Sequence, residues 1–170
     1  MTGLVLATSA TMACGAVDVR FVDAGSFIDG TLQGYGDEPA SNPVLAEIRR
    51  HLLALGERCI PAEQSLELVV RDLDLAGHYD WRYRESFGNF RLLPNVAWAR
   101  LTIEYIWRDA GGGLIAASVD QLHSAEFVSN RSRLRVRDIA LPDEKQLLDR
   151  WFEPRFCGSG ARGAASSATR

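Results

Sequence analysis

Alternating apolar and polar positions mark three regions of the chain as strands. Residues 17–23 (VDVRFVD) and 65–75 (SLELVVRDLDL) place apolar side chains at every second position, which is the spacing of a strand with one buried face. Residues 95–123 contain two such runs around the glycines at 111–113, a pattern typical of an antiparallel hairpin. These regions together predict four strands.

The alternation in the second strand changes phase near Asp72. The apolar face of residues 66–70 passes to Asp72 and Asp74, while Leu73 and Leu75 are apolar in the opposite phase. A change of phase inside one strand predicts a bulge or the departure of the strand from its sheet.

Two further regions have the spacing of helices. In residues 41–58, Asn42 suits an N-cap and Pro43 suits the first helical position. A single apolar stripe follows, made of Val44, Leu45, Ile48, Leu52 and Leu55. Residues 141–154 (LPDEKQLLDRWFEP) predict a second helix that ends at Pro154.

The order of these elements predicts the fold class. Strand, helix, strand, strand, strand and helix give an α+β domain with a mixed four-stranded sheet and two helices packed on one face. We expect this single domain to occupy residues 17–156, between a signal-like segment at 1–16 and a disordered tail at 157–170.

Composition and the start of the chain bear on its location. A net charge of -3 gives no reason to expect nucleic acid as a partner. The first sixteen residues are apolar, small and uncharged and resemble the core and cleavage site of a signal peptide, although no basic residue precedes them. We therefore expect a periplasmic or secreted protein without a transmembrane helix. Residues 11–14 also match a lipoprotein processing site loosely, so a lipid anchor at Cys14 is a weaker alternative.

Cys59 and Cys157 each follow a predicted helix. Because both helices are expected to end at the same edge of the sheet, the two thiols should lie near each other, and an oxidising compartment would allow them to pair. Two unpaired thiols remain the alternative.

Four acids are expected at the opposite edge, where both helices begin: Asp23, Asp72, Asp74 and Asp120. Helix starts offer free N–H groups that stabilise carboxylates, and Arg100 is placed to pair with Asp72 or Asp74. We interpret these acids as structural anchors. The alternative is a calcium-binding protein or a metal-dependent envelope enzyme using Asp72 and Asp74, although the calcium-loop spacing Asp-x-Asp-x-Asp-Gly is missing. No cofactor is expected.

Two arginine-rich segments are candidates for an anion or partner surface. Arg82 and Arg84 alternate with aromatic residues, and Arg131, Arg133 and Arg135 alternate with small and apolar residues. Such segments suit an envelope protein, a glycan or a lipid head group, and a solvated loop is the alternative.

Several stretches together resemble a bacterial family catalogued as domain of unknown function 3016. They are VDVRFVDAGSFIDG, CIPAEQSLELVVRDLDLAG, NVAWARLTIEY and DEKQLLDRWF, and they cover residues 17–153. The resemblance implies a secreted or periplasmic protein but brings no activity, cofactor or catalytic residue. We expect a small exported module that binds an envelope component or assists envelope assembly. We expect a non-enzyme in preference to an enzyme.

Overall fold

The computed structural model describes residues 15–27, 36–76, 78–79, 91–92, 98–124 and 141–158. Its elements, in chain order, are β1 (Ala16–Phe21), η1 (Ala24–Ser26), α1 (Pro43–Cys59), β2 (Ser65–Asp74), β3 (His78–Tyr79), β4 (Arg91–Leu92), β5 (Arg100–Arg108), β6 (Leu114–His123) and α3 (Pro142–Phe156). The short pair β3–β4 forms a separate two-stranded sheet that the hydrophobic pattern does not predict.

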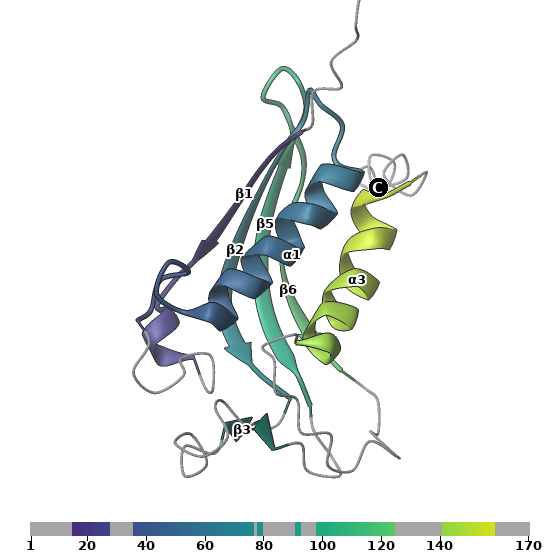
Figure 1. Ribbon diagram of the computed structural model, residues 1–170. Helices are drawn as coiled ribbons and strands as arrows, with labels where there is room; N and C mark the ends of the chain where they lie inside the picture. The colour runs from purple at the N-terminus through teal and green to yellow at the C-terminus, as the bar shows by residue number, and fades with distance from the viewer. Residues whose placement is uncertain are drawn as a thin grey trace, which may run out of the picture.

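The main sheet has the strand order β1-β2-β5-β6. Strands β1 and β2 are parallel, whereas β2–β5 and β5–β6 are antiparallel. Helices α1 and α3 cover the same face of this sheet (Figure 1). We call the helix-covered side the inner face and the other side the outer face. The predicted α+β class and four-stranded mixed sheet are confirmed.

A bulge in β2 decides which side chains point inward. The register of β2 against β5 shifts between Val70 and Asp72, so Arg71 is the extra residue. Leu66, Leu68 and Val70 are buried before the bulge, and Leu73 and Leu75 are buried after it. The phase change in the sequence thus corresponds to a bulge that keeps the apolar side chains on the inner face.

Helix α1 begins as its sequence predicts. The Asn42 side chain accepts hydrogen bonds from the N–H groups of Val44 and Leu45 at 2.9 and 3.3 Å, and Pro43 occupies the first position. All five residues of the predicted apolar stripe are buried. Gly56 faces β1, and a Cβ there would lie 3.0 Å from the Cβ of Val17, so the absence of a side chain lets helix and strand approach closely.

Helix α3 continues two residues beyond its predicted end. Pro154 lies inside the last turn, so the expectation that it ends the helix is wrong. The proline removes one N–H donor, but the N–H of Cys157 still donates to the Glu153 carbonyl at 2.9 Å and closes the turn. The extension places Phe156 among the buried core residues.

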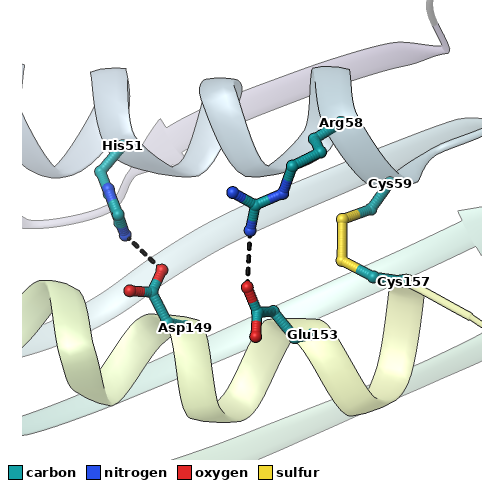
Figure 2. Close-up of a disulfide and its surroundings, with 6 residues drawn as sticks. All are labelled: His51, Arg58, Cys59, Asp149, Glu153 and Cys157. Atoms are coloured by element: carbon teal, nitrogen blue, oxygen red, sulfur yellow. Dashed lines mark hydrogen bonds and ion pairs between the residues drawn. A yellow bond between two sulfur atoms is a disulfide. The ribbon is translucent and has the colours of Figure 1, made fainter.

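The two helices run parallel and are joined along their whole length. Glu47 pairs with Lys145 near the start, His51 Nε2 lies 2.8 Å from Asp149 Oδ1 in the middle, and Arg58 lies 2.6 Å from Glu153 near the end. A disulfide between Cys59 and Cys157 follows directly (Figure 2). The helix layer is therefore cross-linked at the end where both helices finish.

Candidate functional site

Asp72 and Asp74 lie on the outer face, where they share Arg100. The Arg100 guanidinium is 3.7 Å from Asp72 and 3.5 Å from Asp74. The side chain of Arg100 is 45% exposed, that of Asp72 38% and that of Asp74 29%. The bulge at Arg71 causes this placement, because it turns both carboxylates away from the apolar side of the strand. At such distances in solvent the contacts are loose ion pairs that contribute little to stability.

An exposed tryptophan, Trp98, precedes Arg100 by two positions in the chain. Ala99 is buried between Trp98 and Arg100, which are both exposed, so the latter two project to the outer face as alternate residues of a strand do. The Trp98 side chain is 57% exposed. An exposed indole ring on the same face as carboxylates and a guanidinium offers stacking and hydrogen-bonding groups.

Two more arginines lie on the outer face, one in β1 and one in β2. Arg20 lies 3.1 Å from Asp18 and 2.9 Å from Glu67, and Arg71 Nε donates to Glu104 at 2.6 Å. Together with Arg100, Arg20 and Arg71 form what we call the outer arginine row. Sequence reasoning missed this row, although the alternation of β1 and the extra residue at the bulge both signal outward arginines.

Asp120 does not lie with Asp72 and Asp74, where it was expected. It lies on the inner face, where its carboxylate accepts hydrogen bonds from Trp151 Nε1 at 2.9 Å and from the Ser118 hydroxyl at 2.8 Å. Arg155 Nε is 3.1 Å away, and the Asp120 side chain is only 17% exposed. The structure therefore does not bring Asp120 to Asp72 and Asp74, and its partners come from the second half of α3.

These contacts change two pKa values. Burial opposes ionisation of Asp120, but the hydrogen bonds from Trp151 and Ser118 and the charge of Arg155 outweigh it, so the pKa is lowered below its ordinary value. Burial and the Asp120 charge raise the pKa of Tyr105, whereas Arg155 opposes that rise. Asp120 is thus held ionised in a structural ion pair with Arg155, and Tyr105 stays neutral.

The starts of α1 and α3 are held by residues other than the four acids. Asn42 caps α1, and the buried Glu144 in the first turn of α3 accepts a hydrogen bond from the Ala76 N–H at 2.9 Å. Asp23 is exposed, adopts a left-handed backbone with φ 53° and leads into η1. Within residues 15–27 and 36–76, no hydrogen bond or ion pair joins its side chain to Asp72 or Asp74. The predicted gathering of four acids is therefore reduced to a pair.

The side chains of His, Cys, Asp and Glu are the possible metal ligands in the described ranges. Within them, no three His, Cys, Asp or Glu side chains come together in an arrangement that could hold a metal ion. At Asp72 and Asp74 the neighbouring charged group is the Arg100 cation, which opposes the binding of another cation.

Cys59 and Cys157 form a disulfide, with their Cα atoms 4.5 Å apart and 98 positions apart in the sequence. Arg82, Arg84, Arg131, Arg133, Arg135 and Cys14 lie outside the described residues. The two ends of the expected domain, at residues 17 and 156, both fall in described ranges. In the ranges that the structure covers, neither helix has the length and apolar character needed to cross a membrane.

The chain is similar to a solved structure and matches a family model. A crystal structure of a proposed lipoprotein from Caulobacter crescentus CB15 is similar at 14% identity, covering 84% of this chain and 93% of that one, with a TM-score of 0.26. No curated protein matches. The model of the family described as "Protein of unknown function (DUF3016)" matches residues 15–154. The chain therefore belongs to that family.

Proposed function

We propose that this protein is a small exported module of the cell envelope that binds an envelope component and performs no catalysis. The observation that carries the proposal is the disulfide between Cys59 and Cys157, because such bonds persist in oxidising compartments and are rare in the cytosol. The signal-like residues 1–16 favour the same location, periplasmic or secreted.

The outer face of the sheet is the binding surface that we assign to the module. The helices cover the inner face, whereas the outer face presents the outer arginine row, its partner carboxylates and the exposed Trp98. A sheet face that carries arginines, carboxylates and an indole suits a polar ligand with ring planes and hydroxyl groups, so among protein, glycan and lipid components we favour a glycan.

Thiol trapping in cells tests the location. The full chain, with any leader it has in the cell, is expressed, free thiols are alkylated before lysis, and the intact mass is measured. We expect Cys59 and Cys157 to escape alkylation in exported protein and to react when a variant without residues 1–14 is kept in the cytosol. Alkylation of both cysteines in the exported protein would contradict the proposal.

Binding to purified envelope polysaccharide tests the surface. Trp98→Ala and Arg100→Ala should each weaken co-sedimentation with the polysaccharide, since they remove stacking and a charged donor. Arg49→Ala, an exposed arginine of α1 away from the sheet, is the matched control and should bind as the original chain does. Equal binding by all three variants would reject the outer face as the binding surface.

A further inference from the structure

The two edges of the main sheet are protected very differently. Strand β1 is six residues long and carries Asp18 and Arg20 on its outer side. Strand β6 is ten residues long, and its sequence LIAASVDQLH contains no Lys, Arg, Pro or Gly. Natural edge strands avoid pairing with other chains by being short or by carrying charges, prolines or bulges. Edge β1 has two of these devices, and most of β6 has none.

The single carboxylate of β6 does not protect this edge from pairing with another strand. Asp120 turns inward to Trp151, Ser118 and Arg155, so its charge is neutralised beneath α3. On the outer side of the same strand Val119 is 57% exposed. The register of β6 against β5 is continuous from Ala116 to His123. This leaves a regular strand segment with an apolar side chain at its middle.

Backbone geometry identifies the groups that point away from β5. The Ser124 N–H donates to the Ala99 carbonyl at 2.9 Å, and the register places these two residues opposite each other. Hydrogen-bonded and non-bonded pairs alternate in antiparallel strands. The N–H and C=O groups of Ala117, Val119, Gln121 and His123 therefore point outward, and no described residue pairs with that side of β6.

We propose that β6 pairs with β6 of a second copy of this chain in an antiparallel, twofold-symmetric dimer. With the axis at Val119, each Val119 lies opposite its equivalent, and Ala117 lies opposite Gln121 of the second copy. These three pairs form about six backbone hydrogen bonds. The self-paired position holds the exposed apolar residue, and no like charges meet across the axis, so the edge is complementary to itself.

Helix α3 leaves room for this pairing. Its Trp151 and Phe156 rings lie 6.2 and 5.3 Å from Tyr105, and Phe156 is 5.4 Å from Trp107. Both of those partners belong to β5, and Trp151 and Arg155 also contact Asp120 of β6. The helix therefore lies over the inner face and leaves the outer side of β6, where Val119 is 57% exposed, uncovered. The two outer faces become one continuous surface in the dimer, which would give a repetitive ligand two attachment points.

Sedimentation equilibrium of the full chain over a concentration series tests the dimer. We expect dimers in the original chain and monomers at the same concentrations in Val119→Lys, which places two like charges opposite each other. Val22→Lys is the matched control because Val22 is also exposed, at 40%, but follows β1 on the far edge. It should remain dimeric, and circular dichroism should show that both variants are folded.

Residue-resolved amide exchange shows whether this edge is the interface. On dimerisation the amides of Ala117, Val119 and Gln121 should gain protection, while those of Ser118, Asp120 and Leu122 already bond to β5 and should change little. A chain that is monomeric at every concentration overturns the proposal. A dimer that persists in Val119→Lys, or that lacks the alternating protection, overturns it as well. Neither result depends on export or glycan binding.

Discussion

Asp120 and the Asp72–Asp74 pair lie on opposite faces of one sheet and illustrate two uses of a carboxylate. Asp120 is largely buried and accepts two hydrogen bonds besides its contact with Arg155. Asp72 and Asp74 are more exposed and share one arginine at longer distances. Burial makes an ion pair costly to break, whereas exposure leaves its groups open to other partners. The inner face therefore serves stability, and the outer face is available for binding.

The largest effect on the free energy of unfolding is expected from the disulfide that cross-links the two helices on the inner face. In the chain-entropy model a cross-link spanning 98 positions stabilises by on the order of 4 to 5 kcal/mol. Cys59→Ser combined with Cys157→Ser should lower the free energy of unfolding by about that amount, measured by urea denaturation.

The reducing agent supplies the control for the disulfide. Reductant should destabilise the original chain to the level of the double variant and leave the double variant unchanged. If the double variant unfolds at the same urea concentration as the oxidised chain, the helix layer is held by its ion pairs and apolar contacts alone.

An intermediate effect is expected at Asp120. Asp120→Asn removes the charge that Trp151, Ser118 and Arg155 contact, which should cost about 1–3 kcal/mol at neutral pH. Because the folded pKa of Asp120 is lowered, its contribution is present above the ordinary aspartate value of about 4 and is lost as pH falls through the lower folded value. Urea denaturation at several pH values should therefore show the variant approaching the original chain in acid.

Asp72→Asn is the matched control for this measurement, because it makes the same substitution on the outer face of the same sheet. It should change the free energy of unfolding less than Asp120→Asn does. Equal losses at the two positions would mean that burial does not separate the two faces in energy.

Much of the fold could be predicted because local patterns determine it. Strand alternation, the apolar stripe of α1 and the Asn42–Pro43 start are all properties of short segments. The phase change at Asp72 likewise predicts a bulge or the departure of the strand from its sheet, and the structure has the bulge. Each of these features depends on residues that are close together in the sequence.

The position of Asp120 could not be predicted in the same way. In β6 the apolar Ala117 and Val119 occupy one phase and Ser118 and Asp120 the other, so the pattern alone favours an outward Asp120. The structure reverses this assignment because Trp151, 31 positions later, provides a buried donor to Asp120, and Arg155 adds a charge. Only the packing of α3 brings these groups together, and the reversal is also what leaves Val119 exposed.

The smallest effect is expected at the outer acids, and it separates binding from anchoring. Because Asp72, Asp74 and Arg100 are solvent-exposed and loosely paired, Asp72→Asn combined with Asp74→Asn should change the free energy of unfolding by less than about 1 kcal/mol. Thermal melting of the full chain measures this change. A larger loss would restore the view of these acids as anchors of the fold.

Calcium titration of the same two proteins tests the remaining alternative. A cation that binds only the folded chain raises the melting temperature in proportion to the logarithm of its concentration above the dissociation constant. Arg100 already supplies positive charge between the carboxylates, so calcium should leave the melting temperature of the original chain unchanged. A saturable rise that the double variant lacks would show that Asp72 and Asp74 bind a metal, and that the arginine moves aside to admit it.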